Sequence, residues 1–369
     1  MKAAVVSLGS VSSQWTIESM KNYFDCVDNL NIKYIEITFS GEKAEILYKG
    51  KPLPNYDCIF AKGSFRYANV LKTLTVLLGS HCYMPIEHHA FTIAHDKLLT
   101  QLELQKNNIP MPATYMASTI GAARSILERL NYPIVMKFPQ GTQGKGVLFA
   151  DSFASASSIL DALSSLRQPF IIQEYVETGG TDIRAFVVGD KVVAAFERKA
   201  TVKEKRANVH TGGTGTAIDL DDGTKRLAVN AAKAIGAKIC GVDILMSHKG
   251  PLVIEINISP GLQGITEYSG IDVSSKIAEF LYSNTKERHE KYHKESAEEI
   301  LASIDKVDRG TGDEGSLITS LDFRGSRVLL PEVVTKAANL KDSDNYVFIA
   351  RNGEVQIKKF DIGSEKDSE

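Results

Sequence analysis

Three oxygen-bearing side chains near residue 250 could bind a metal ion. Asp243 lies in one apolar stretch, and Glu255 and Asn257 lie in the next, with a polar turn at Ser247–Gly250 between them. Side chains alternate faces along a strand, so Glu255 and Asn257 share a face, and strand pairing can bring Asp243 against them. Such carboxylate and amide oxygens suit Mg²⁺ when phosphate oxygens complete its shell. A half-buried hairpin with solvated acids is the plain alternative.

A lysine followed by a glycine-rich loop forms a second candidate site. Lys137 ends an apolar stretch, and the loop after it contains Gly141, Gly144 and Gly146. Backbone N–H groups in such a loop can approach phosphate oxygens where a Cβ would clash. The loop does not match G-x-x-x-x-G-K-[ST], so a P-loop is excluded. A flexible hairpin loop is the alternative, which Lys137 and the loop's own Lys145 make less attractive.

Polar and basic side chains continue along the chain between these two sites. Several could contact an adenine, a ribose, phosphates or carboxylates: Gln173, Glu174, Tyr175, Val176, Asp182, Arg184, Arg206 and Asn208. The basic run from Arg198 to Arg206 leads into a glycine loop at His210–Gly215. Such a run suits phosphate and carboxylate clamping, although basic runs are more often solvated edges. His210 could act as a general base, or simply bond a carbonyl group. Arg66 could pair with a substrate carboxylate, or be a surface arginine.

Length and composition set limits on the protein class. A chain of 369 residues suggests two or three domains, and 43% apolar and 24% charged residues are typical of a soluble globular protein. The net charge of −2 gives no reason to expect a polyanion-binding surface over the whole molecule. The four cysteines form no C-x-x-C pair, so neither zinc nor a disulfide framework is indicated. Without a membrane-length apolar run or a signal peptide, we expect a cytoplasmic protein with no membrane contact.

Hydrophobic patterning divides the chain into five parts. The first part alternates strands and helices, including a predicted helix over Ser10–Val27 and a strand over Ile32–Phe39. Hairpins and helices then predict an α+β domain, with a hairpin turn at Gly189-Asp190. The predicted parts are an α/β domain at 1–90, an α+β domain at 91–283, a charged helical linker at 284–315, a small β-rich domain at 316–361 and a disordered tail at 362–369.

Taken in chain order, these signals resemble the ATP-grasp superfamily, and specifically its RimK-type α-L-glutamate ligases. The resemblance covers Asp96 to Lys276. Its most specific stretches are Gly141-Thr-Gln-Gly-x-Gly-Val147, Asp182-Ile-Arg184, Gly241-Val-Asp-Ile-Leu245 and Asn257-x-Ser-Pro-Gly-Leu262. It implies an ATP-grasp fold of class α+β, in which two lobes clasp ATP after an N-terminal α/β pre-ATP-grasp domain.

The resemblance also assigns roles to residues of this chain. For the phosphates it implies contacts from Lys97 and Lys137 and from the glycine loop with Gly141, Gly144 and Gly146. For the nucleoside it implies an adenine site at Gln173, Glu174, Tyr175 and Val176 and a ribose contact from Asp182. It also implies phosphate and acceptor contacts from Arg206 and Asn208, and catalytic roles for Lys137, Arg184 and Arg206. Asp243, Glu255 and Asn257 would hold two Mg²⁺ ions, with Mn²⁺ as an alternative.

The implied reaction joins a carboxylate to an amine. The carboxylate attacks the γ-phosphoryl group of ATP to give an acyl phosphate and ADP, and the amine of L-glutamate then displaces phosphate. Such phosphoryl transfer needs positioning and charge neutralisation more than a protein nucleophile. The acceptor could be a protein C-terminus, a polyglutamate chain or a coenzyme, while cousins in amino-acid biosynthesis act on a carrier protein. Ser259-Pro-Gly-Leu-Gln-Gly264 resembles the glutamate-adding branch.

The segment from Leu317 to Phe360 resembles the AbrB/SpoVT swapped-hairpin domain, which interlocks as a dimer and often binds DNA. We therefore expect a homo-oligomer, either a dimer or a tetramer. Lys and Arg exceed Asp and Glu by only two in this segment, which is thin for a phosphate-tracking surface. We therefore favour dimerisation or acceptor presentation over nucleic-acid binding. A nucleotide-sensing DNA-binding regulator is the second hypothesis.

Overall fold

The computed structural model describes residues 1–41, 43–139, 146–165, 169–199, 214–307, 322–324, 327–351 and 354–360. The chain splits into two compact units, Met1–Lys286 and Glu287–Glu369. The predicted domains 1–90 and 91–283 both fall within the first unit, and the boundary between them stays a prediction. Helix α9, Val273–Val307, starts before the predicted linker at 284–315. Among the described residues, no helix combines the length and apolar character needed to cross a membrane.

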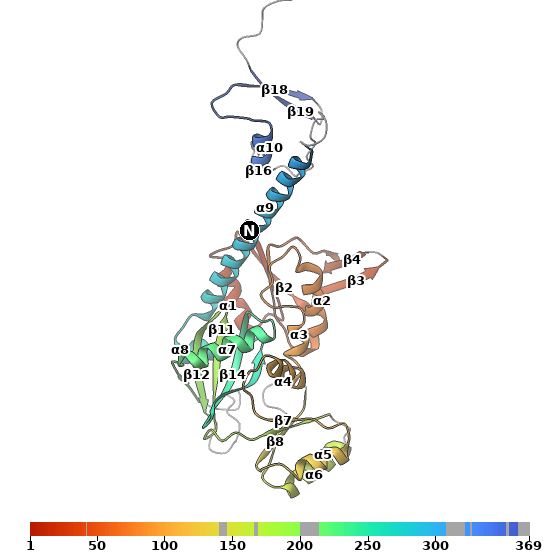
Figure 1. Ribbon diagram of the computed structural model, residues 1–369, viewed down its shortest axis with the longest axis vertical. Helices are drawn as coiled ribbons and strands as arrows, with labels where there is room; N and C mark the ends of the chain where they lie inside the picture. The colour runs from red at the N-terminus through yellow and green to blue at the C-terminus, as the bar shows by residue number, and fades with distance from the viewer. Residues whose placement is uncertain are drawn as a thin grey trace, which may run out of the picture. The chain divides into compact units, whose positions relative to one another are not determined.

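The N-terminal layer is built on a parallel three-stranded sheet (Figure 1). Strand β1 (Lys2–Ser7) lies between β2 (Cys26–Asn31) and β6 (Cys58–Ala61), and helix α1 (Val11–Met20) connects β1 to β2. Other elements of this layer are an antiparallel sheet of β3 (Ile35–Ser40), β4 (Lys43–Tyr48) and β5 (Lys51–Pro52), the short helices η1 (Ile32–Tyr34) and η2 (Phe65–Tyr67), and helices α2 (Ala68–Leu78) and α3 (Ala90–Ile93).

A helix and a strand predicted for this layer are present, but one boundary of each was wrong. The helix predicted over Ser10–Val27 ends at Met20, and the strand predicted over Ile32–Phe39 begins only at Ile35. The missed strand, β2, is a polar edge strand with the sequence Cys-Val-Asp-Asn-Leu-Asn. An edge strand of this kind buries little apolar surface, so it lacks the hydrophobic alternation that marks a strand.

A four-stranded antiparallel sheet forms a second layer with its own hydrophobic core. Its order is β7 (Thr114–Tyr115), β10 (Ile171–Glu174), β8 (Ile134–Lys137) and β9 (Val147–Ala150). Helices α5 (Ile120–Leu127) and α6 (Phe153–Ser165) pack together on this sheet (Figure 1). Their core includes Leu127, Ile134 and Leu160, and it is separate from the main core of the unit.

A five-stranded antiparallel sheet completes the first unit. Its order is β13 (Thr214–Ala217), β12 (Lys191–Lys199), β11 (Thr181–Val188), β14 (Ile239–Ser247) and β15 (Gly250–Asn257). The hairpin predicted at Gly189-Asp190 is confirmed, with Gly189 at a φ of +63°. Helices α7 (Asp222–Ala234), α8 (Gln263–Ser269) and the start of α9 pack against it, and one core joins this sheet to the N-terminal layer.

The second unit contains two short hairpins. Strands β16 (Asp322–Arg324) and β17 (Arg327–Leu329) form the first, helix α10 (Glu332–Ala337) follows, and β18 (Tyr346–Arg351) and β19 (Glu354–Lys359) form the second. Both hairpins lie within the segment 316–361, for which the sequence predicts a small β-rich domain. The interlocked dimer and the DNA contacts that the resemblance implies stay predictions.

Candidate active site

One cavity of about 520 Å³ in the first unit gathers residues from all three layers. A volume of this size suits a cofactor or a small-molecule substrate. The predicted site residues that line it are Lys97, Lys137, Gln173, Glu174, Tyr175, Val176, Asp182, Arg184, Asp243, Glu255 and Asn257. Gly146 is described but is not a lining residue. Gly141, Gly144, Arg206, Asn208 and His210 lie outside the described residues.

The predicted pairing of the acidic strands is confirmed. On β14 and β15, Asp243 stands opposite Glu255 and Gly241 opposite Asn257. A register shift follows Asp243, so Ile254 has no direct partner on β14 and lines the cavity beside Glu255. The amide of Asn257 fits its neighbours with nitrogen donating to Glu255 Oε1 (3.3 Å) and oxygen accepting from Arg184 Nη2 (3.0 Å).

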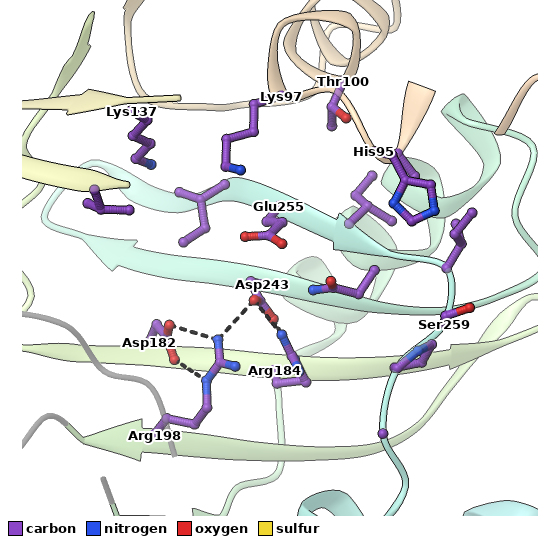
Figure 2. A pocket seen from close by; sticks show the side chains of 18 of the residues that line it. His95, Lys97, Thr100, Lys137, Asp182, Arg184, Arg198, Asp243, Glu255 and Ser259 are labelled. Carbon is purple, nitrogen blue, oxygen red and sulfur yellow. Dashed lines mark hydrogen bonds and ion pairs between the residues drawn. The ribbon is translucent and has the colours of Figure 1, made fainter. Parts of the chain in front are cut away.

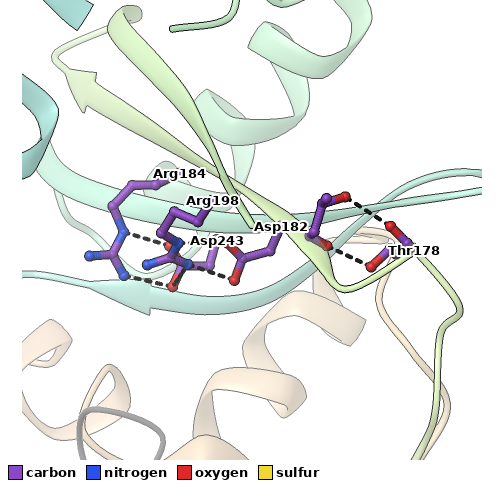
Figure 3. Close-up of polar contacts among 6 residues, drawn as sticks. Thr178, Asp182, Arg184, Arg198 and Asp243 are labelled. Carbon is purple, nitrogen blue, oxygen red and sulfur yellow. Dashed lines mark hydrogen bonds and ion pairs between the residues drawn. The ribbon is translucent and has the colours of Figure 1, made fainter. Parts of the chain in front are cut away.

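Four charged side chains, of which Arg198 and Asp243 are buried and Asp182 and Arg184 are partly buried, pair across three neighbouring strands (Figure 3). Arg184 on β11 stands opposite Asp243 on β14, and its Nε and Nη2 donate to that carboxylate at 2.7 and 2.6 Å. Asp182 on β11 stands opposite Arg198 on β12, whose Nε and Nη2 donate to it at 2.6 and 2.8 Å. Arg198 Nη2 also lies 2.9 Å from Asp243 Oδ2. The network therefore consists of two bidentate arginine–carboxylate pairs, and the guanidinium of Arg198 links them.

The two carboxylates of this network differ in proton affinity. Burial raises the pKa of Asp182 to about 6, a rise that Arg198 opposes and the charge of Asp243 increases. Burial acts on Asp243 in the same direction, but Arg184 and Arg198 outweigh it and hold its pKa below the usual range. Asp243 therefore carries the negative charge that the two arginines neutralise.

The oxygen donors on this face fit a hard divalent cation. Glu255 and Asn257 offer one carboxylate and one amide oxygen, the ligand types that Mg²⁺ prefers. Asp243 is less available as a metal ligand because each of its oxygens already accepts at least one arginine hydrogen bond. Its Oδ1 accepts only one and keeps a lone pair for a cation. Within the described part of the chain, no group of three His, Cys, Asp or Glu residues could hold a metal, so the amide is an essential member of this donor set.

Two lysines face these oxygen donors. Lys97 is the first residue of helix α4 (Lys97–Lys106), whose preceding residue Asp96 caps the helix by accepting from two backbone N–H groups. Lys137 ends β8, and its Nζ donates to Gln173 Oε1 at 2.5 Å. Figure 2 shows both lysine side chains directed toward the strand that carries Glu255. Two ammonium groups across from oxygen ligands can hold the phosphates of a nucleotide.

The remaining wall of the cavity suits a flat ring. The rings of Phe149 and Tyr175 meet edge to face at 5.9 Å, and Val135, Val147 and Leu245 add apolar surface. At the end of β10, Glu174 is held in place where its Oε2 accepts from the backbone N–H of Ala113 at 3.3 Å. The cavity thus combines an apolar surface, two cations and a set of oxygen ligands.

Sequence reasoning assigned no site role to several lining residues, including Lys62, His95 and Ser259. The sequence did contain a signal for Lys62, namely a lysine at the carboxyl end of an apolar strand. Lys62 directly follows the buried strand Cys58–Ala61, and Lys137 ends the strand Ile134–Lys137 in a similar way. Arg66, for which the sequence left open a substrate-carboxylate contact or a place on the surface, is exposed on η2 and is not a lining residue of the cavity.

Comparisons with known proteins identify the family of this chain. The family model of the RimK-like ATP-grasp domain matches residues 94–281. A probable alpha-L-glutamate ligase from Saccharophagus degradans is 37% identical over 280 residues, which cover 74% of this chain and 91% of the relative.

Solved structures support the same fold. The ATP-grasp ligase PsnB, complexed with a minimal precursor, is 16% identical with a TM-score of 0.61, covering 76% of this chain and 98% of PsnB. PsnB complexed with the precursor, Mg and ADP is 17% identical with a TM-score of 0.59, covering 77% and 98%. At such low identity these two structures bear on the fold alone. The chain belongs to the RimK-like ATP-grasp family, and it is an ATP-dependent ligase that joins a carboxylate to an amine.

Proposed function

We propose that this ligase adds L-glutamate, through its amine, to a carboxylate of an acceptor such as a protein C-terminus, a polyglutamate chain or a coenzyme. The cavity supports this because it brings two lysines to the same space as Glu255 and Asn257. The choice of glutamate is supported by relatives named as probable alpha-L-glutamate ligases. The acceptor carboxylate would attack the γ-phosphoryl group of ATP, and the glutamate amine would then displace phosphate from the acyl phosphate.

In this proposal the protein supplies position and charge. Lys97 and Lys137 hold the phosphates, while Gln173 accepts from Lys137 and orients its ammonium group. Glu255, Asn257 and the free lone pair of Asp243 would hold Mg²⁺, with two ions expected, which neutralises charge on the triphosphate when bound. Arg184 lies between Asp243 and Asn257, where its guanidinium can stabilise charge on the transferred group. Glu174, Tyr175, Val176 and Asp182 would bind the nucleoside.

The decisive experiment measures ADP release by the purified full chain with ATP and Mg²⁺. We expect release to require both L-glutamate and an acceptor, for which α-L-glutamyl-L-glutamate is the first probe. Mass spectrometry of the product should show one added glutamyl residue per ADP. ADP release that is the same with and without glutamate and dipeptide would contradict the proposal.

The lysine at the end of β8 predicts a pH dependence. Burial lowers the pKa of Lys137 to about 8, an effect that Glu255 opposes and Lys97 reinforces. Above that pH the free enzyme loses the ammonium charge, so at saturating glutamate kcat/KM for MgATP should fall as the pH rises through about 8. In Lys137→Arg the guanidinium stays charged, and this decline should disappear. Lys249→Arg, on an exposed turn, should keep the wild-type profile; a decline that persists in Lys137→Arg would exclude this origin.

A further inference from the structure

The carboxyl ends of the parallel sheet open into the cavity. The chain leaves β1 through α1 to reach β2 on one side, and later returns to β6 on the other side of β1. In open α/β sheets, ligands bind at such a switch of direction, outside the carboxyl ends of the strands. Here Ser7 ends β1 and Lys62 follows β6, and both line the cavity.

Lys62 is a buried cation at this point. It is 6% exposed, and no carboxylate of the described residues forms an ion pair with it. Its Nζ lies 5.8 Å from the centre of the Phe60 ring. Burial alone lowers its pKa to about 8. An ammonium group without a counter-ion is costly to bury, so an anionic ligand would relieve a real penalty.

The backbone holds Lys62 firmly in place. Its N–H donates to the carbonyl oxygen of Val6 at 2.9 Å, which continues the pairing of β1 with β6. The next N–H, of Gly63, donates to Ser259 Oγ at 2.7 Å. Ser259 stands two residues after Asn257, so Lys62 is tied to the end of the strand that carries the oxygen ligands.

The start of α1 adds a second positive element. This helix runs for 10 residues, Ser10 caps it by accepting from Ser13 N–H, and its first turn contains no acidic residue. Ser10 and Ser13 both line the cavity. A helix N-terminus carries partial positive charge and exposed N–H groups, which favour an anion beside Lys62.

His95 supports a polar ligand in this part of the cavity. Its Nε2 is buried without a hydrogen-bond partner among the described residues, and buried polar atoms of that kind call for a ligand or water. In Figure 2, His95 and Ser259 lie at the opposite end of the view from Lys137. This end is therefore distinct from the one where the two lysines would hold phosphates.

We propose that Lys62 and the N-terminus of α1 bind a carboxylate of the substrates that does not react. This inference rests on the proposed glutamate ligation, in which the activated carboxylate must lie beside the phosphates while the amino acid and a peptide acceptor carry further carboxylates. Either substrate could supply the group, and separate kinetic constants distinguish them.

The test replaces Lys62 by Met in the full chain and measures KM separately for L-glutamate, for α-L-glutamyl-L-glutamate and for MgATP. Losing a charged hydrogen bond should raise one substrate KM about 10- to 100-fold and leave the MgATP KM unchanged. A rise for glutamate places the amino acid at Lys62, and a rise for the dipeptide places the acceptor there. Equal rises in all three constants, or no rise, would overturn the proposal. Lys62→Arg should recover part of the loss.

Two controls separate other causes. Lys43→Met removes an exposed lysine from β4 and should leave all three constants unchanged. Because the Lys62 charge is costly to bury, Lys62→Met should keep or raise the Tm, so lost affinity cannot be assigned to unfolding. Calorimetric titration of glutamate and dipeptide into wild type and Lys62→Met gives a readout without turnover. Wild-type binding that Lys62→Met loses would support the site even if glutamate ligation fails, and equal binding by both proteins would overturn it.

Discussion

Replacing Glu255 by Gln should reduce kcat by about three orders of magnitude. A bound divalent cation contributes several kcal/mol to phosphoryl transfer, and each 1.4 kcal/mol is about tenfold in rate. Glutamine keeps the size of the side chain but removes the charge that faces Lys97 and Lys137. Steady-state ADP release across a Mg²⁺ titration measures the effect, and the concentration of Mg²⁺ at half-maximal activity should rise.

The matched control is Glu267→Gln, which makes the same chemical change at an exposed position of α8 away from the cavity. It should retain wild-type activity. Both variants should unfold at the wild-type temperature, because neither residue belongs to the buried ion pairs. Near-normal kcat in Glu255→Gln would remove this residue from the proposed metal site.

Replacing Arg198 by Met should lower the free energy of unfolding by about 3–5 kcal/mol, because it leaves the buried Asp243 and the partly buried Asp182 without their shared partner. The loss should be larger at pH 7.5 than at pH 5. The folded-state pKa of Asp182 is about 6, above its usual value, so stability linked to its protonation is present at low pH and lost as the pH rises through 6. Without Arg198 this pKa should rise further. Urea unfolding at both pH values measures the difference.

An exposed ion pair provides the comparison. Arg124 pairs with Asp161 at 2.9 Å, with side chains 41% and 64% exposed. Arg124→Met should cost less than about 1 kcal/mol because solvent screens such a pair. Equal losses in the two variants would show that burial does not set the strength of the Arg198 network.

The acidic hairpin was predictable because its signals are local. Two apolar stretches joined by a short polar turn give a hairpin, and the period of two then decides which side chains share a face. Asp243 and Glu255 accordingly pair in the structure. The order and spacing of the other motifs along the chain then supported the family assignment.

The ion-pair network could not be predicted in the same way. It requires β11 to lie between β12 and β14, and hydrophobic patterning does not reveal strand order. Arg198 was visible in the sequence as one of several cations in a basic run. Only the register, with Asp182 opposite Arg198 and Arg184 opposite Asp243, shows that it is neutralised within the protein. The orphaned charge of Lys62 was hidden for the same reason, because burial depends on layers brought together from distant segments.

The division of the hydrophobic core has a mechanical consequence. The N-terminal layer and the five-stranded sheet share one core, whereas the four-stranded layer has its own. If the four-stranded layer rotated as a rigid body, both hydrophobic cores would stay intact. Separating the N-terminal layer from the five-stranded sheet would instead expose apolar surface to water. We therefore expect any hinge motion that admits and encloses nucleotide to occur in the segments that connect the four-stranded layer to the rest of the unit. Lys137 would then move with the four-stranded layer, while Glu255 would stay fixed on the five-stranded sheet.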